Sequence, residues 1–509
     1  MSLSVVLVKA RSVHTFSMKN PSSDEIPLLS ETELELEKCV PSLSSRLKHY
    51  IHCACMTLVI FLFLVAGGSI SVPYITLVKH IPEFDPIDNY GTWLTLSLYI
   101  TKCIALLALP QVIFNFMGLL KYRAFPDKPI LKSSPILGPF ICIRVVTRGD
   151  TPNLVRKSVE HNLKTCLKAG LENFIVEVVC DLPVGLPEHR RVRETIVPSR
   201  YKPSSGCLFK ARALQYCLED DVNDLADSDW IVHLDEETRL TEDAVKGILN
   251  FVTSGEHQFG QGLITYTHIT MKNVIITLCD TFRVAEDLGK LRYQFKAWHA
   301  PFFGMKGSYV VSQVGAEKLV SFNHGPDGSI AEDCFFSIVA ASKGYSFDFI
   351  EGEMWEQSPF TVKDFLEQRK RWLQGILLTV HSSVLPWKNK WLLAISLYSW
   401  ITMPISTSNV FLAPLYPIPM PWVIDFAINF IGGMNLYLYI YGVIMSFSIK
   451  KIGIFKFILY IIGAIASTPL KLVIENLAVV YGLLTNKYRF YIVKKELEDY
   501  TKVPAVSLV

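Results

Sequence analysis

The sequence predicts an α/β domain with a mixed, mostly parallel sheet, placed between hydrophobic segments that cross a membrane. Half of the 509 residues are hydrophobic, the mean hydropathy is +0.30 and only 19% are charged. This composition is too apolar for an ordinary soluble protein of this length. The apolar residues gather on both sides of residues 136–385, and that central stretch alternates short apolar runs with a helical pattern. Such a rhythm is typical of parallel strands covered by helices.

The N-terminal part divides into a polar tail and two membrane helices. Residues 1–45 are rich in serine and glutamate and lack an apolar start, so we expect a disordered cytosolic tail. Residues 46–130 hold two apolar runs, Cys53–Val72 and Trp93–Leu120. Each provides the roughly 20 residues that a membrane helix needs. Lys102 lies inside the second run, where it could mark function, snorkel or face another helix.

The C-terminal part, residues 389–485, is predicted to be a second membrane region. Trp391–Leu412 and Val423–Phe447 read as two spans. The last apolar stretch, Phe457–Leu484, is interrupted by a proline, a lysine and a glutamate, which favours a broken or re-entrant hairpin. Residues 486–509 then form a basic cytosolic tail.

Basic residues predict the orientation of these spans. Arg46 and Lys48 precede the first span, and Lys121, Arg123 and Lys128 follow the second, whereas the loop between them is poor in lysine and arginine. The positive-inside rule then places the central domain and both termini in the cytosol. We expect a multi-pass protein of the endoplasmic reticulum or the Golgi.

The central domain, residues 131–388, contains three predicted strands. Phe140–Val146 is a β-branched apolar run, Asn153–Ala169 has helical spacing, and Phe174–Val179 and Trp230–Leu234 are two more strands. Ligands of such sheets bind beyond the carboxyl ends of the strands.

Charge and cysteine usage exclude several classes of function. The net charge is only +3 and the basic residues form no stripe, so nucleic acid is not expected as a partner. The 11 cysteines are dispersed without a C-x-x-C pair, which argues against a disulfide framework and a structural zinc site.

Acidic residues recur where the predicted strands end. Asp150 follows the first strand, Asp181 the second, and Asp235 and Glu237 leave the third. One such residue alone is more often a turn former or a helix cap, but three successive strand ends indicate a functional edge. Asp235 and Glu237 can both point toward a divalent cation, Mg²⁺ or Mn²⁺, which would neutralise a leaving diphosphate.

Four motifs follow one another in a recognisable order. They are Lys210–Leu214 (K-A-R-A-L), Asp235–Glu237 (D-E-E), Ala331–Asp333 (A-E-D) and Gln368–Trp372 (Q-R-K-R-W). This succession resembles the family 2 inverting glycosyltransferases with a GT-A fold. Two positions depart from the family pattern: Glu237 stands where many relatives carry aspartate, and Thr147–Asp150 replaces an Asn-Glu ending of the first strand.

The resemblance implies a role for each matching residue. It places the nucleotide-sugar donor on Thr147, Asp150, Asp181, Lys210, Asp235, Gln368, Arg371 and Trp372. It places the cation on Asp235 and Glu237, and the acceptor on Phe303, Gly304 and Trp372. Asp333, with Glu332 beside it, would be the general base.

Elementary chemistry agrees with these roles. Inverting transfer needs one carboxylate to take the proton of the acceptor hydroxyl, and Asp333 is the candidate. Gln368 and Arg371 are three positions apart and share one helical face. The guanidinium offers a fork of donors for a diphosphate, and Trp372 offers an apolar platform for a sugar.

Three longer sequence segments make the resemblance more specific. His233–Arg239, Ala331–Phe336 and Trp355–Gln374 are similar to the egghead-type β-1,4-mannosyltransferases of invertebrate glycosphingolipid synthesis. This implies GDP-mannose as donor and glucosylceramide, a membrane glycolipid, as acceptor; the residues alone indicate neither guanine nor mannose.

Two alternatives remain open. A processive polysaccharide synthase of the cellulose, chitin or hyaluronan type shares Q-x-x-R-W, but four to six modest spans leave little room for a channel. A catalytically inactive membrane scaffold would not need the intact carboxylates Asp235, Glu237 and Asp333.

Overall fold

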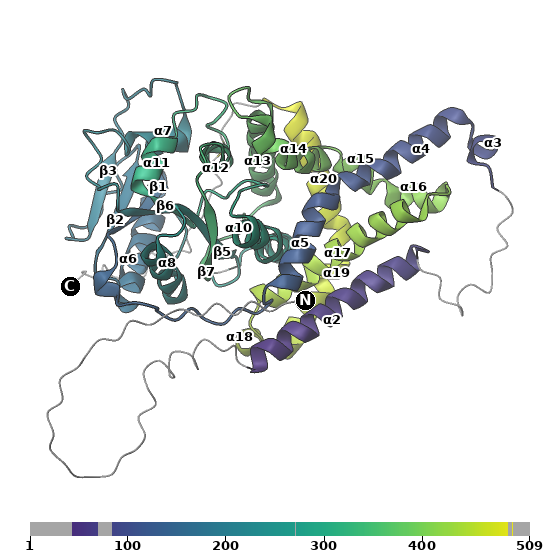
Figure 1. The fold of residues 1–509 in the computed structure, drawn as a ribbon, viewed down its shortest axis with the longest axis horizontal. Helices are drawn as coiled ribbons and strands as arrows, with labels where there is room; N and C mark the ends of the chain where they lie inside the picture. The colour runs from purple at the N-terminus through teal and green to yellow at the C-terminus, as the bar shows by residue number, and fades with distance from the viewer. Residues whose placement is uncertain (1–42, 70–83, 270, 487–490, 492–509) are drawn as a thin grey trace, which may run out of the picture. The chain divides into compact units, whose positions relative to one another are not determined.

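The computed structural model describes residues 43–69, 84–269, 271–486 and 491 (Figure 1). The tails predicted for residues 1–45 and 486–509 lie almost entirely outside these residues.

The central domain is built on one seven-stranded sheet in the order β3-β2-β1-β4-β6-β5-β7. Its strands are β1 Ile141–Thr147, β2 Phe174–Cys180, β3 Val192–Ile196, β4 Trp230–Asp235, β5 Phe259–Thr265, β6 Val310–Gln313 and β7 Phe347–Trp355. Strand β6 runs antiparallel to both of its neighbours, and all other pairs are parallel. The predicted fold class, a mixed and mostly parallel sheet with helices, is confirmed.

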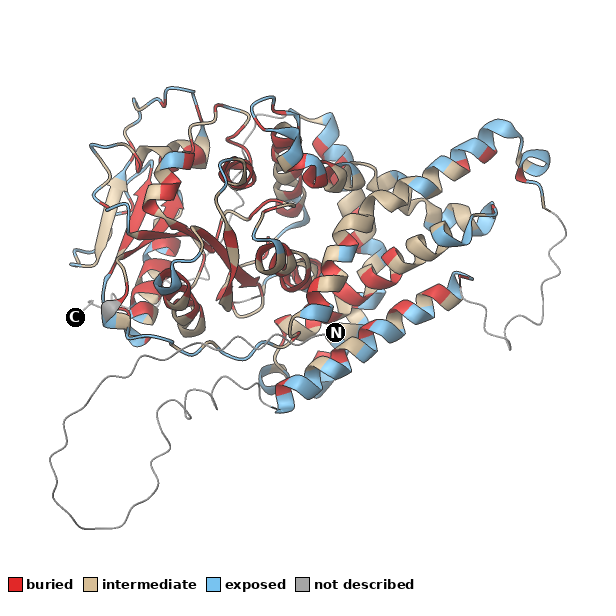
Figure 2. Cartoon of the chain, viewed as in Figure 1, coloured by how far each residue is buried: buried red, intermediate tan, exposed pale blue. Residues whose placement is uncertain are grey.

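Helices cover both faces of this sheet. One face carries α6 Pro152–Lys168 and α8 Glu242–Ser254, and the other carries α7 Phe209–Tyr216, α11 Val314–Val320 and α12 Glu332–Ser342 (Figure 1). Most of the sheet is buried between them (Figure 2), as the apolar runs predicted.

The strands that the sequence analysis did not find have weak local signals. Strand β5 contains Gly260 and Gly262, and glycine is depleted in strands. Both are required by packing, since a Cβ at Gly262 would lie 2.2 Å from the Tyr309 ring and one at Gly260 2.7 Å from Ile350. Strand β6 has only four residues. Tertiary contacts therefore decide this half of the sheet.

Three helices are long and apolar enough to cross a membrane, or four if one bent pair forms a single span. They are α2 Leu43–Ala66, the 30-residue run Thr92–Lys121 (α4, η1 and α5) and α17 Trp422–Ser446. The bent pair is α19 Ile454–Ala466 and α20 Thr468–Leu484, which meet at 52°. These candidate spans are consistent with a membrane protein.

Two of the predicted spans differ in detail from the structure. Helix α2 begins at Leu43 and ends at Ala66, ahead of the predicted Cys53–Val72, because Gly67 and Gly68 follow it. The single span predicted for Trp391–Leu412 is wrong.

In its place are three short helices, α14 Trp387–Ile401, α15 Met403–Thr407 and α16 Asn409–Leu415. Pro404 stands at the start of α15, where it lacks the amide hydrogen that would continue the hydrogen-bond ladder from α14, and Pro414 lies inside α16.

Two glycines bring membrane helices onto the backbone of the central domain. A Cβ at Gly118 of α5 (Leu109–Lys121) would lie 2.0 Å from the Gly289 oxygen, in the π-helix η3 Asp287–Leu291. A Cβ at Gly442 of α17 would lie 2.1 Å from the Thr281 oxygen, in α9 Val274–Glu286. The helical run α9–η3 is therefore fixed directly to two candidate spans.

Candidate active site

A cavity of about 660 Å³ lies at the carboxyl ends of β1, β2 and β4. This volume suits a small-molecule ligand, since such pockets typically measure roughly 300–1,000 Å³. Its wall includes eleven of the thirteen predicted site residues, namely Thr147, Asp181, Lys210, Asp235, Glu237, Phe303, Glu332, Asp333, Gln368, Arg371 and Trp372. Residues distant in sequence are thus brought to one place.

Lys210 stands at the centre of the polar wall. Its Nζ donates to Asp235 Oδ1 at 2.6 Å and to the Gly307 carbonyl at 2.8 Å, and lies 3.7 Å from Glu332 Oε1. Burial alone would lower the pKa of Lys210, but attraction to Asp235 and Glu332 outweighs it and raises the pKa. The ammonium therefore stays charged.

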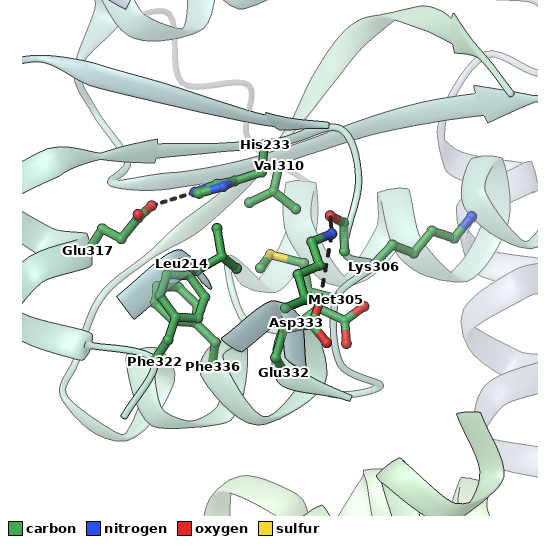
Figure 3. A pocket seen from close by; sticks show the side chains of 12 residues that line it. Leu214, His233, Met305, Lys306, Val310, Glu317, Phe322, Glu332, Asp333 and Phe336 are labelled. Atoms are coloured by element: carbon green, nitrogen blue, oxygen red, sulfur yellow. Dashed lines mark hydrogen bonds and ion pairs between the residues drawn. The ribbon is translucent and has the colours of Figure 1, made fainter. Parts of the chain in front are cut away.

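Asp333 is a carboxyl group poised near neutrality. Burial raises its pKa to about 7, and the neighbouring charge of Glu332 adds to this shift. The two carboxyl groups lie side by side at one end of a small space, opposite the paired His233 and Glu317 (Figure 3). The N-cap of α12 is Ala331, so Asp333 stands inside the first turn and is not the cap. A general base works best with a pKa near the working pH.

The loop before β6 reaches these groups through its backbone. A Cβ at Gly307 would lie 3.1 Å from Asp333 Oδ2 and 3.3 Å from Lys210 Nζ, so a larger residue would crowd both. Gly304 has φ +79, which favours glycine, and lies against Cys334. Gly304 itself lies outside the residues that line the cavity, whereas its neighbour Phe303 lines it.

Two buried glutamines hold this loop in place. Gln261 donates to the Lys306 carbonyl at 3.0 Å and accepts from the Lys306 amide at 3.0 Å. Gln294 holds the preceding part of the loop in the same way. It donates to the Gly304 carbonyl and accepts from the Phe303 amide, both at 2.9 Å. These two residues were missed because glutamine in a strand and in a helix carries no motif.

Asp235, Glu236 and Glu237 all line the cavity, and Glu236 also accepts hydrogen bonds from Thr147 and Thr151. Within the described part of the chain, no group of three or more His, Cys, Asp or Glu side chains could hold a metal. A cation at Asp235 and Glu237 would therefore need oxygen ligands from a diphosphate and water, which Mg²⁺ and Mn²⁺ accept readily. The residues present fit such an ion.

The two aspartates predicted near the nucleoside have different positions. Asp181 lies at the cavity and pairs with Arg212 at 2.7 Å. Asp150 is not part of the cavity wall and lies 3.5 Å from Arg148. The chain turns at Gly149, which has φ +93 and follows the end of β1 at Thr147. Asp150 therefore does not lie in the cavity wall, although it comes soon after the strand.

The Q-x-x-R-W residues lie on α13 Val362–His381, and all three face the cavity. The guanidinium groups of Arg283 and Arg369 stand over the Trp372 ring, at 4.5 and 4.4 Å from its centroid. Buried Arg369 is held by Asp280 at 3.0 Å and by Glu475 of α20 at 3.1 Å. The platform at Trp372 is thus fixed by charges from α9 and from the bent C-terminal pair.

Arg283 also lines the cavity and was missed by the sequence analysis. It lies on the apolar helix α9, three residues after Asp280. The only local feature of the sequence that indicates a role for Arg283 is the opposite charge of Asp280, three residues before it in an apolar helix. From the sequence, Glu475 was interpreted only as an interruption of an apolar stretch, and its pairing with Arg369 was not predicted.

Comparison with known proteins shows the family to which this chain belongs. The sequence profile described as "Glycosyl transferase family group 2" matches residues 230–445. The β-1,4-mannosyltransferase egh of Drosophila melanogaster is 57% identical over 457 residues, covering 89% of this chain and 99% of the relative. The chain belongs to the egh and bre-3 family of β-1,4-mannosyltransferases. It is a glycosyltransferase of family 2, in agreement with the GT-A-type fold expected from the motifs.

Further relatives extend the comparison. The bre-3 enzyme of Caenorhabditis elegans is 53% identical, covering 90% of this chain and all of the relative. Among solved structures, the mannosyltransferase PcManGT of Pyrobaculum calidifontis, in complex with GDP-Man and Mn²⁺, aligns at a TM-score of 0.42 and 15% identity, covering 72% of this chain and 99% of that one.

The contact between Arg369 and Glu475 can be tested by mutation. Glu475→Ala removes one of the two carboxylates that hold buried Arg369, so we expect stability to fall by about 1–3 kcal/mol, with a lower melting temperature in detergent. Turnover should fall as well, because Trp372 loses support. The control Glu256→Ala removes an exposed carboxylate from the loop after α8 and should behave like the parent. If Glu475→Ala also matched the parent, Asp280 alone would suffice to hold Arg369.

Proposed function

We propose that this enzyme transfers mannose from GDP-mannose to glucosylceramide and forms a β-1,4 linkage with inversion. The observation that carries the proposal is the joint presence of a partly buried base, Asp333, and two carboxylates for a cation, Asp235 and Glu237, around one cavity. The names of the egh and bre-3 relatives support the mannosyl donor and the linkage.

The chemistry follows from this arrangement. The acceptor hydroxyl attacks the anomeric carbon of mannose from the face opposite the diphosphate, so that one C–O bond forms as the other breaks. The bonding electron pair leaves with the diphosphate, and the hydroxyl proton passes to Asp333. A cation bound at Asp235 and Glu237 would supply positive charge for the diphosphate. Arg371 and Arg283, which both line the cavity, add positive charge from the protein.

Product analysis tests the function directly. The purified protein in lipid, supplied with GDP-mannose and glucosylceramide, should add a single hexose to the lipid, as measured by mass spectrometry. A ladder of additions would support a polysaccharide synthase. No transfer from any of several nucleotide-sugars would support an inactive scaffold.

Chelation tests the cation site. Because a cation held by Asp235 and Glu237 would neutralise the leaving diphosphate, we expect EDTA to abolish transfer and either Mg²⁺ or Mn²⁺ to restore it. The double variant Asp235→Ala, Glu237→Ala should stay inactive at any metal concentration. Full turnover of the parent enzyme in excess EDTA would rule out this assignment.

Asp333→Asn tests the general base. It removes basicity but keeps the size of the side chain, so turnover should fall by about 10²–10⁴-fold, while the melting temperature and nucleotide binding change little. Loss of nucleotide binding would indicate a donor-site role instead.

The pH profile gives an independent check of Asp333. Its pKa of about 7 means that the ionised, basic form increases as the pH rises. The turnover of the parent enzyme should therefore increase from pH 6 to pH 8, and a profile that is flat across this range would contradict the assignment.

We infer that residues 137–385 face the cytosol, in a membrane of the endoplasmic reticulum or the Golgi. The basic residues beside α2 and α5 support this orientation, as does the cytosolic source expected for a nucleotide-sugar. In sealed vesicles that expose the cytosolic face, added protease should cleave the central domain without detergent. Protection until detergent is added would reverse the orientation.

A further inference from the structure

We propose that the connection between α17 and α19, together with the surface around Trp355, binds the headgroup phosphate of an anionic phospholipid. The connection, residues 447–453, contains the short helix α18 Ile449–Ile452 (Figure 1). This inference concerns the membrane lipid and not the sugars, so it stands or falls separately from the proposed function.

The connection lies at the end of a candidate span, where lipid headgroups are found. Helix α17 ends at Ser446, and α19, the first half of the bent pair, begins at Ile454. The central domain contacts the end of α17 directly, because the Thr267 hydroxyl after β5 donates to the Ser446 carbonyl. The connection and this part of the central domain therefore lie at the level where the chain leaves the hydrocarbon.

Exposed apolar and basic side chains follow one another along this stretch. Ile449 and Phe455 are 46% and 88% exposed, and Lys450, Lys451 and Lys456 are exposed beside them. Within the described part of the chain, none of these three lysines forms an ion pair with a carboxylate. Apolar side chains that enter the headgroup region, next to lysines that meet phosphates, are typical of a segment lying on an anionic membrane.

The central domain fixes one of these lysines beside an aromatic surface. Lys451 Nζ lies 3.2 Å from His268 Nδ1 and 5.8 Å from the centre of the Trp355 ring, on which the His268 ring stacks at 4.8 Å. Burial lowers the pKa of His268, so the neutral ring accepts from the Lys451 ammonium. Glu353 accepts from Trp355 Nε1 at 3.2 Å and lies 3.6 Å from His268 Nε2. The ammonium of Lys451 is thus held in place without a carboxylate of its own, which leaves its charge for a phosphate.

Trp355 joins this surface to the segment that carries the acidic residues 235–237. Arg239 and Trp355 exchange two backbone hydrogen bonds of 2.9 Å, and Glu356 accepts from the Thr238 hydroxyl at 2.8 Å. Arg239 also adds a cation next to Trp355, and its buried Nε has no hydrogen-bond partner among the described residues. A headgroup bound at Lys451 and Trp355 would therefore hold this segment against the membrane surface.

Melting temperatures in detergent with added lipid test the site. Phosphatidylglycerol should raise the melting temperature of the parent by about 3 °C or more above that with phosphatidylcholine, because a ligand of the folded state stabilises it. The double variant Lys450→Ala, Lys451→Ala should bind phosphatidylglycerol about tenfold or more weakly, and Lys450→Arg, Lys451→Arg should bind like the parent. The control Lys164→Ala, Lys168→Ala removes the same charge from exposed positions of α6 and should respond like the parent.

Three outcomes of this titration would overturn the site. Equal shifts with both lipids would show that the headgroup charge does not matter. An unchanged response of the alanine double variant would exclude the two lysines. Inorganic phosphate that produces the whole shift without lipid would assign the lysines to a soluble anion.

Hydrogen exchange locates the contact in the unmodified chain. The parent is compared in nanodiscs of phosphatidylcholine alone and with added phosphatidylglycerol, without nucleotide-sugar or acceptor. Peptides that cover residues 446–456 and 351–357 should exchange more slowly with phosphatidylglycerol, and protection confined to other segments would contradict the proposal. Because no turnover is measured, a failure to transfer mannose would refute the proposed function and leave this result decisive.

Discussion

The Lys210 ammonium and the carboxylates around it hold the reaction centre together. Lys210 comes from α7, Asp235 from β4, Glu332 and Asp333 from α12, and the carbonyl of Gly307 from the loop before β6. In a buried site of low dielectric, such attractions are strong, and an unpaired charge would be costly. One cation therefore links four separate segments, while burial and the neighbouring Glu332 bring the pKa of Asp333 near neutrality.

The membrane helices take part in forming the site. Glu475 of α20 holds Arg369, which stands over Trp372. Gln374 of α13 also donates to the carbonyls of Gly482 and Thr485. On the opposite side, close glycine contacts fix α9 and η3 to α5 and α17. Contacts with candidate membrane helices thus support the walls of the cavity at Trp372 and at Arg283.

The success of the sequence analysis depended on local signals. The strands β1, β2 and β4 are apolar and β-branched, so their burial could be read directly, and the motifs around Lys210, Asp333 and Arg371 have fixed spacing. Arg283 and Gln261 have no such signal, since each matters only through what stands opposite it in space. Trp391–Leu412 misled because its composition suits a span, whereas the helix there breaks at Thr402, just before Pro404.

By itself, the sequence determined the α/β class, the flanking membrane helices and the order of the catalytic motifs, because hydrophobic periodicity and motif spacing are properties of neighbouring residues. Only the tertiary structure decided that Asp150 and Gly304 lie outside the cavity wall, and that Glu475 of α20 pairs with Arg369 over the Trp372 ring. These outcomes depend on contacts between residues far apart in the chain. Such contacts are set by packing and by the pairing of buried charges.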